Sequence, residues 1–311
     1  MTRDPLFLSI GECMVELSPG AGDDWRLGYA GDSFNTAWYA RRTLGPEWRV
    51  GYLTRIGTDR FSDAMAAFIA AAGIEDGFLT RDPDRGVGLY AISLDRGERS
   101  FTYWRGQSAA RRLADDRAAL DVAFAQAAVL YLSGITLAVL EGDGRQTLID
   151  ALAAARAGGA RVVFDPNLRP RLWASLDEMR DWVMRAAGQA DLVLPSFDDE
   201  AQHFGDADPQ ATIARLHGAG AGMVVVKNGG GAVHFAGRDT PAGSLDGLKV
   251  SAPVDTTAAG DSFNAGFLAA WLDGAPIRAA IRAGHAIASQ VVMQRGALCP
   301  VDLPADPLAE G

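Results

Sequence analysis

Lysine is almost absent from this chain of 311 residues, because only Lys227 and Lys249 among its 29 basic residues are lysines. Acidic residues number 39, and the formal net charge is −10. An acidic protein repels nucleic acids and anionic membrane surfaces, so we expect neither as a partner. The same charge means that an anionic substrate has to be captured by positive side chains placed locally.

Cysteine is also scarce, and Cys13 and Cys299 match no metal-binding or redox spacing. Isolated cysteines indicate reduced thiols, so we expect a cytoplasmic location. The first ten residues have no apolar stretch typical of an export signal, and no run is long enough to span a bilayer. The histidines show no ligand spacing and are interpreted as structural: His203, His217, His234 and His285.

Two nucleotide-binding fingerprints are missing. The sequence has no Gly-Lys-Ser/Thr of the P-loop kind, and Gly11-Glu12-Cys13 completes no dinucleotide motif, which disfavours a dehydrogenase. A nucleotide would therefore need another device. The segment 227–231, Lys-Asn-Gly-Gly-Gly, is a candidate because glycines let the backbone approach a phosphate or an adenine. A purely structural turn between two strands is the alternative.

Apolar strands and amphipathic helices alternate regularly in the second part of the chain. After a helix from residue 118, the pattern predicts strands at 128–132, 161–164, 191–194 and 223–226 and helices at 140–157, 176–187, 260–272 and 278–294. Continuous Val/Leu strands that alternate with helices are typical of a parallel sheet covered on both faces. We therefore expect an α/β protein with one domain over 1–311.

The first part of the chain has a different pattern. It predicts strands at 6–10, 13–17, 25–29 and 50–56, helices at 30–44 and 60–72, and two alternating strands at 87–94 and 100–105. The last two strands would pair as a hairpin around a turn at 95–98. Together with the strands at 13–17 and 25–29, this hairpin could form a small separate sheet.

Polar residues follow several predicted strands of the larger sheet. They occur at 165–169, at Pro195-Ser196 and at 227–229. Ligands of open α/β sheets bind at the carboxyl ends of the strands, so these segments are expected to meet at a ligand site.

The segment 255–266 concentrates small residues at the start of a predicted helix. Ala258, Ala259 and Gly260 leave room for an anion to approach the free amides of the first turn, which the helix dipole favours. Asp261 follows in the same turn. A carboxylate beside a bound phosphate has a reason to be there if it accepts a proton from an attacking hydroxyl. An ordinary acidic first turn is the alternative.

The hexamer Ala-Gly-Asp-Ser-Phe-Asn occurs twice, at 30–35 and at 259–264. Asp32 is therefore a second candidate for the base. Only the later copy follows a run of small residues that could hold an anion, so we assign the base to Asp261. The carboxylate and amide of the first copy, Asp32 and Asn35, suit the hydroxyls of a polyol.

The segment 255–261 resembles the second signature of the ribokinase-like (PfkB) carbohydrate kinases, with Ala258 in place of the glycine of many members. The resemblance implies a three-layer, doubly wound, mostly parallel sheet with a small β-sheet lid, here about 12–30 and 87–106. It also implies that Ala258, Ala259 and Gly260 form an anion hole for the base Asp261. The residues implied to bind substrate in the first hexamer are Gly31, Asp32 and Asn35. Those implied to bind nucleotide are Asn167, Ser196, Lys227, Gly229, Gly231, Ala258 and Gly260.

The residues implied to bind the sugar include two arginines. A neutral sugar needs no arginine, whereas a carboxylate gains from a bidentate guanidinium. The set Tyr90, Tyr103, Arg105 and Arg169, with Gly11-Glu12, Leu132–Ile135 and Leu172-Trp173, resembles the branch that phosphorylates 2-keto-3-deoxygluconate. A kinase for a neutral sugar such as fructose or ribose, and a non-catalytic member that binds nucleotide or sugar, stay open.

The resemblance further implies ATP and Mg²⁺, with a possible monovalent cation, and a homo-oligomer. The family's Asn-x-x-Glu motif corresponds to Ser196 and Asp199 here. Whether Asp199 or Glu200 touches the metal stays open, because Mg²⁺ is often held through waters and phosphates.

Overall fold

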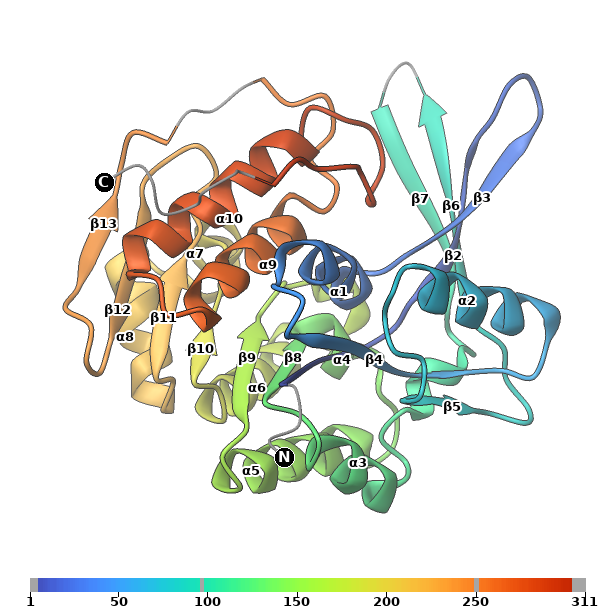
Figure 1. The fold of residues 1–311 in the computed structure, drawn as a ribbon, viewed down its shortest axis with the longest axis horizontal. Coiled ribbons are helices and arrows are strands. Elements are labelled where there is room, and N and C mark those ends of the chain that lie inside the picture. The colour runs from blue at the N-terminus through green and yellow to red at the C-terminus, as the bar shows by residue number, and fades with distance from the viewer. Residues whose placement is uncertain (1–4, 96–97, 249–251, 304–311) are drawn as a thin grey trace.

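A mixed sheet of nine strands forms the centre of the part of the chain that the structure describes (Figure 1). The structure is a computed structural model and describes residues 5–95, 98–248 and 252–303. In spatial order the strands are β13 (Gly243–Leu245), β12 (Val233–Gly237), β11 (Met223–Val226), β10 (Leu192–Val193), β9 (Arg161–Asp165), β8 (Val129–Ser133), β1 (Leu6–Ile10), β4 (Arg49–Ile56) and β5 (Leu79–Arg81). Only β12 runs antiparallel to its neighbours β11 and β13, so the mostly parallel sheet is confirmed.

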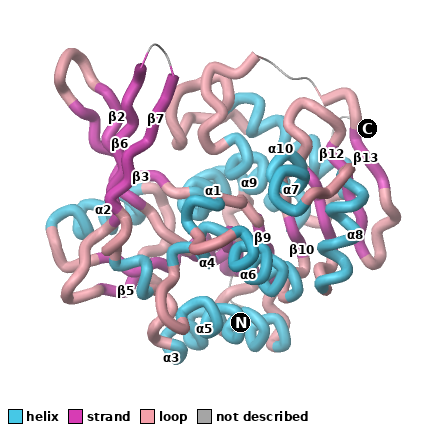
Figure 2. The backbone as a smooth tube through the Cα atoms, turned by 180° about the vertical axis from the view of Figure 1, so that it is seen from behind, coloured by secondary structure: helices cyan, strands magenta, loops and turns pink. Residues whose placement is uncertain are grey.

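Helices cover both faces of this sheet (Figure 2). Residues of its inner strands alternate between two apolar clusters, one on each face. In β8, Val129 and Tyr131 pack into one cluster, and Leu130 and Leu132 pack into the other. The helices on the Tyr131 face are α1 (Asp32–Thr43), α2 (Arg60–Ala71), α9 (Ala259–Leu272) and α10 (Ile277–Val291). Those on the opposite face are α3 (Arg117–Phe124), α4 (Gly134–Val139), α5 (Gly144–Ala157), α6 (Leu176–Gly188) and α8 (Pro209–Ala219).

A second, four-stranded sheet projects from one side of these layers (Figure 1). Its order is β3 (Trp25–Ala30), β2 (Met14–Pro19), β6 (Gly88–Asp95) and β7 (Glu98–Trp104). The pairs β2–β3 and β6–β7 are antiparallel, and β2–β6 is parallel. The separate small sheet is therefore confirmed, while residues 96–97 of the predicted turn lie outside the described residues, as does Lys249.

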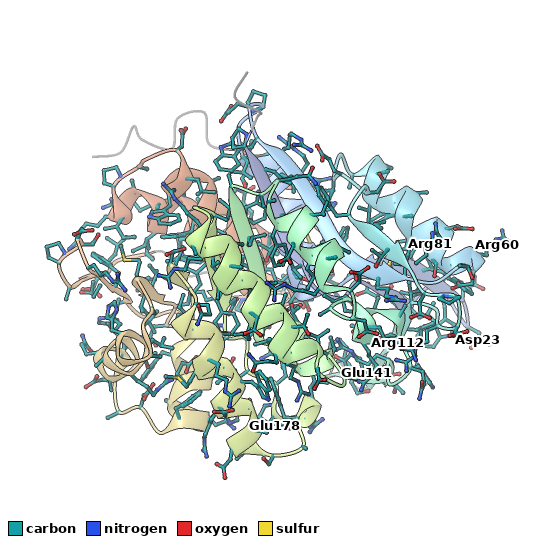
Figure 3. All side chains as sticks on the ribbon, turned by 90° about the horizontal axis from the view of Figure 1, so that it is seen from below. Asp23, Arg60, Arg81, Arg112, Glu141 and Glu178 are labelled. Carbon is teal, nitrogen blue, oxygen red and sulfur yellow. The ribbon has the colours of Figure 1, made fainter. Side chains whose placement is uncertain are left out.

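Ion pairs hold the base of the β6–β7 hairpin. Asp82 is fully buried before β6, and it pairs with Arg55 at 3.1 Å and with Arg112 at 3.4 Å. Arg112 ends the short 3₁₀ helix η1 (Ala109–Arg112) after β7 and also pairs with Glu141 at 3.3 Å, and the two labelled side chains meet in Figure 3. The segments that enter and leave the hairpin are thus tied to each other and to the loop between α4 and α5.

The helix predicted at 140–157 is wrong at its start. In the structure, α4 ends at Val139 and α5 begins at Gly144. The side chain of Ser133 caps α4, and Gly142 adopts a left-handed φ of 55°, which interrupts the helical path. The pattern also fails to predict the helices α4, α7 (Phe197–Phe204) and α8 and the short edge strands β5, β12 and β13. Within the described residues, no helix is long and apolar enough to cross a membrane.

Candidate active site

The strand order of the central sheet reverses at β1: β4 and β5 lie on one side of it, and the later strands from β8 onward lie on the other. Such a switch point leaves a crevice at the carboxyl ends of the strands. A cavity of about 410 Å³ opens there. All the predicted site residues line it except Gly229 and Gly231. Its lining includes Glu12, Gly31, Asp32, Asn35, Tyr90, Tyr103, Arg105, Asp165, Asn167, Arg169, Ser196, Asp199, Lys227 and residues 256–261.

Helix α9 begins at one wall of this cavity. Ala258 precedes its first turn and has a left-handed φ of 59°. The amides of a first helical turn have no acceptors within the helix, and they carry the positive end of the helix dipole. The only other non-glycine residue with positive φ in the described chain, Asn167, also lines the cavity. Strained backbone of this kind concentrates at functional sites.

Asp261 projects from this first turn and is 9% exposed. Its carboxylate accepts a hydrogen bond from Asn35 Nδ2 at 2.8 Å. Burial raises the pKa of Asp261 above its ordinary value of 3.8, and the neighbouring charge of Asp32 raises it further, against the Asn35 hydrogen bond. A carboxylate with a raised pKa is a better proton acceptor, which suits a general base.

The two copies of the repeated hexamer begin α1 and α9, which pack against each other. Asn35, the last residue of the first copy, holds Asp261 of the second copy. Asn264, the last residue of the second copy, donates to Tyr131 Oη at 3.0 Å and to Asp165 Oδ2 at 2.6 Å. The two copies therefore start two helices whose asparagines belong to one polar cluster. The sequence alone indicates only that the two helix starts pack in a similar way.

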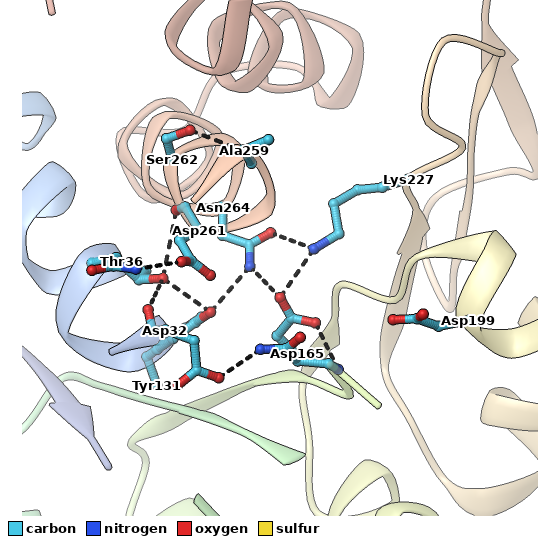
Figure 4. Close-up of polar contacts among 12 residues, drawn as sticks. Asp32, Thr36, Tyr131, Asp165, Asp199, Lys227, Ala259, Asp261, Ser262 and Asn264 are labelled. Atoms are coloured by element: carbon cyan, nitrogen blue, oxygen red, sulfur yellow. Dashed lines mark hydrogen bonds and ion pairs between the residues drawn. The ribbon is translucent and has the colours of Figure 1, made fainter. Parts of the chain in front are cut away.

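Lys227 turns its side chain inward rather than along the glycine turn that follows it. Its ammonium donates to Asp165 at 3.0 Å and to Asn264 at 3.1 Å (Figure 4). Asp32 accepts at 2.6 Å from Asn167, whose amide N–H is bonded to Asp165. These contacts link the first hexamer, the end of β9 and the end of β11 in one polar network that is buried at Asp165, Lys227 and Asn264.

Aromatic and charged side chains from the four-stranded sheet and the end of β7 form another wall. The rings of Tyr90 and Tyr103 lie 5.7 Å apart, and Tyr90 donates a hydrogen bond to Glu16. Arg105 reaches the cavity from the end of β7, but it forms an ion pair with the buried Glu12. Within the described residues, Glu12 Oε1 has no hydrogen-bond partner.

Glu12 is thus a site residue that the sequence interpretation does not assign. It lies two residues after the end of β1, so the rule that ligand-binding residues gather at strand carboxyl ends could have found it.

Arg169 and Asp199 lie at the outer rim of the cavity, 3.4 Å apart. Burial raises the pKa of Asp199, while Arg169 counteracts this effect. Glu200 points elsewhere: it is fully buried and paired with Arg215 at 2.6 Å, and burial raises its pKa to about 7. Of the two neighbouring acids, Asp199 is the one that faces the cavity.

Gly229 and Gly231 belong to the turn between β11 and β12 and do not line the cavity. Gly229 needs its left-handed φ of 50°, and a Cβ at Gly231 would lie 2.7 Å from Asn228 Nδ2. The shape of the turn is therefore enough to explain why both positions are glycine. A larger hollow of about 550 Å³ lies elsewhere, and its one acid, Asp191, is bonded to Arg156.

The model of the pfkB family carbohydrate kinases matches residues 5–303. The chain belongs to the PfkB family of carbohydrate kinases. It is 41% identical over 302 residues to 2-dehydro-3-deoxygluconokinase of Dickeya dadantii (strain 3937), which covers 94% of this chain and 96% of that protein. The corresponding enzyme of Escherichia coli (strain K12) is 41% identical over 300 residues, with the same coverage.

The fold is also found in solved structures. A PfkB protein from Polaromonas sp. JS666 superposes with a TM-score of 0.81 at 28% identity, and the match covers 93% of this chain and 96% of that one. The ribokinase-like architecture inferred from the sequence is therefore confirmed. Within the described part of this PfkB kinase, no group of three or more His, Cys, Asp or Glu side chains could hold a metal ion.

Replacing Asp261 with asparagine keeps the shape of the side chain but removes the proton acceptor. We expect the rate of phosphoryl transfer to fall by roughly 10²–10⁴. Because the pKa of Asp261 is raised in the folded protein, its ionised form opposes folding near neutral pH, so Asp261→Asn should not lower the melting temperature. Turnover assays and thermal unfolding test both points; a variant that keeps more than about a tenth of the rate excludes Asp261 as the base.

The raised pKa of Asp261 also predicts the pH profile. The base works only when ionised, so kcat/KM should fall tenfold per pH unit below a pKa that lies well above 4. Asp32→Asn removes a charge that raises this pKa, so it should move the acid limb of the profile to lower pH. Steady-state kinetics between pH 4 and pH 9 measure both; an acid limb near pH 4, or one that Asp32→Asn leaves in place, contradicts this assignment.

Proposed function

We propose that this PfkB kinase transfers the γ-phosphoryl group of ATP to the terminal hydroxyl of 2-keto-3-deoxygluconate, giving 2-keto-3-deoxy-6-phosphogluconate. One observation carries the substrate: the cavity that contains the buried Asp261 also contains two arginines, Arg105 and Arg169. A guanidinium can hold the carboxylate of an acid sugar bidentately. The relatives named above, which the chain matches over nearly its whole length, support the same substrate.

The reaction needs a hydroxyl placed between Asp261 and the start of α9. Asp261 accepts the hydroxyl proton, and the amides of Ala258, Ala259 and Gly260 stabilise the charge on the transferred group. The N–H of Ala259 donates to Thr256 O at 3.2 Å in this structure, so it would be shared between that carbonyl and the phosphoryl group. The carboxylate of Asp32 is assigned to the sugar hydroxyls. The amide of Asn167, which donates to Asp32, is assigned to the nucleotide. Asn35 is committed to Asp261, so its proposed contact with substrate is combined with holding the base.

ATP is proposed to lie across the end of β11 and the start of α9. Lys227, Ser196, Asn167, Ala258 and Gly260 face the cavity on that side. Gly229 and Gly231 of the adjoining turn are proposed to let the adenosine approach the backbone.

Mg²⁺ fits the site as an ion carried by the phosphates, because the described residues offer no cage of protein ligands. Asp199, with its carboxylate at the cavity, is the residue proposed to face it, and the ion would neutralise charge on the phosphates. A monovalent cation stays part of the proposal on the family resemblance alone.

A kinase for a neutral sugar is the second candidate. Each cavity arginine already has an acidic partner, Glu12 for Arg105 and Asp199 for Arg169. Arginines that are neutralised in this way could serve structure rather than a substrate carboxylate, and the variants described below separate the two possibilities.

The remaining features of the proposal concern assembly and location. Reduced, buried Cys13 and Cys299 support a cytoplasmic protein. Large apolar side chains of the lid sheet are exposed, among them Trp25 at 52% and Trp104 at 59%, and they support a homo-oligomer. We therefore propose a cytoplasmic homo-oligomer.

Removing either cavity arginine should weaken binding of the acid sugar. A charge-assisted hydrogen bond is worth about 1.5–3 kcal/mol, so Arg105→Ala or Arg169→Ala should raise KM for 2-keto-3-deoxygluconate at least tenfold. Lysine at position 105 should rescue only in part, because it lacks the bidentate fork. Arg117→Ala, which removes an exposed arginine on α3, is the matched control and should behave like wild type.

The kinetics are compared on the acid sugar and on fructose or ribose. Neutral sugars should be poor substrates for the wild type and should be little affected by Arg105→Ala. If the wild type prefers a neutral sugar, or if both substrates lose equally in the variants, the acid-sugar assignment fails and the second candidate replaces it.

The lid segments, about 12–30 and 87–106, should close when substrate binds. Tyr103 lines the cavity but is 51% exposed, so closure would bury it and exclude water from the reaction. Hydrogen exchange should show added protection in β2, β3, β6 and β7 with sugar and a non-hydrolysable ATP analogue, while α5 on the opposite layer stays unchanged. Equal protection of the lid strands with and without ligands would refute a moving lid.

A further inference from the structure

The orientation of the Lys227 side chain does not follow from the glycine turn next to it in the sequence. The glycines that follow it form the β11–β12 turn, yet the lysine side chain points away from that turn into the cavity and is only 9% exposed. Its ammonium lies between Asp165 and Asn264, at 3.0 and 3.1 Å. A buried cation with two fixed acceptors has a defined position, which is a requirement for acting on a reacting group.

The ammonium lies beside the start of α9. A Cβ built on Gly260 would lie 3.6 Å from Nζ, so only the absence of a side chain there separates the lysine from the first-turn amides. An ammonium has three N–H donors. The acceptors found for it within the described residues are Asp165 and Asn264, which leaves a donor for a ligand in the cavity.

We propose that Lys227 is a catalytic residue that binds the transferred phosphoryl group, and that Asn264 and Asp165 position its ammonium. This inference rests on the kinase function proposed above, and it adds a role at the reacting phosphorus to the nucleotide contact suggested by the glycine turn.

In this reaction the substrate hydroxyl oxygen forms a bond to the γ-phosphorus, and the bond between that phosphorus and the β,γ-bridging oxygen breaks. The hydroxyl proton passes to Asp261, and ADP leaves with the electron pair of the broken bond. Lys227 offsets negative charge on the oxygens of the phosphoryl group together with the adjacent α9 amides.

The two copies of the repeated hexamer have matching roles in this arrangement. Asn35 holds the proton acceptor Asp261, and Asn264 holds the cation Lys227, at 2.8 and 3.1 Å. Each copy thus fixes one of the two charged groups of the reaction. The lysine at this position, in a chain that otherwise uses arginine, supplies a compact point charge rather than the planar fork of a guanidinium.

Nucleotide binding tests the contact without any sugar. Lys227→Met keeps an unbranched side chain of similar length and removes the charge. By calorimetric titration with Mg²⁺ present, this variant should bind the non-hydrolysable analogue AMP-PCP at least tenfold more weakly than wild type and should bind ADP within threefold. Equal losses for both nucleotides, or no loss for either, overturn the proposal.

Steady-state kinetics supply the second readout. Lys227→Met should lower kcat by roughly 10²–10³ and leave KM for the sugar within about threefold. Arg145→Met is the control for a half-buried cation outside the cavity: it should lower the melting temperature and leave the preference for AMP-PCP over ADP intact. A small change in kcat for Lys227→Met contradicts the catalytic role.

The positioning role of Asn264 requires a double-mutant cycle. Asn264→Ala should lower kcat about tenfold in the wild-type background and less than about twofold in the Lys227→Met background, because it acts through the lysine. Equal effects in the two backgrounds would show that Asn264 acts independently and would overturn that part.

Lys227→Met leaves Asp165 buried without its cation, which can impair folding. The variant that combines Lys227→Met with Asp165→Asn removes both charges and should fold, and it should show the same loss of preference for AMP-PCP. Recovery of that preference in the neutral pair overturns the proposal. A wild type that binds neither nucleotide, or phosphorylates no sugar, refutes the proposed function instead.

Discussion

The hydrogen bond between Asn35 and Asp261 is the contact on which the site depends. It joins the first turns of α1 and α9, which lie more than two hundred residues apart in the chain. It also orients the carboxylate of Asp261, which is buried. A buried carboxylate is costly unless its lone pairs are satisfied. The packing of α1 against α9 is therefore what allows a base with a raised pKa to exist at the cavity.

The same requirement explains the polar centre around the base. Lys227, Asp165 and Asn264 satisfy one another where three strand or helix ends meet. Breaking such a buried pair costs about 3–5 kcal/mol, whereas an apolar core would fold as well or better. The left-handed backbone of Asn167 and Ala258 adds local strain at the same cavity. The central sheet and its two apolar clusters offset these costs. The site lies at β1, where the strand order of the sheet reverses.

The sequence was sufficient wherever the information is local. Strand and helix periodicity predicts the parallel sheet, the lid hairpin and the start of α9, and the small residues before Asp261 predict its place in the first turn. What depends on distant parts of the chain was out of reach. No local pattern shows that Glu12 pairs with Arg105, that Asn35 holds Asp261, or that Lys227 turns away from its glycines. Helix α4 was missed because it is only six residues long, and the predicted start of α5 at residue 140 falls four residues before its start at Gly144.

In the proposed function, the buried carboxylate and the arginines of a single cavity together serve phosphoryl transfer to an acid sugar. Analysis of the wild-type reaction by ³¹P NMR, with ATP and either 2-keto-3-deoxygluconate or a neutral sugar, tests it most directly. The expected product is one phosphomonoester on the terminal carbon of the acid sugar, formed in equal amount with ADP. Preferential phosphorylation of fructose or ribose, or release of ADP and inorganic phosphate without a sugar phosphate, would contradict it.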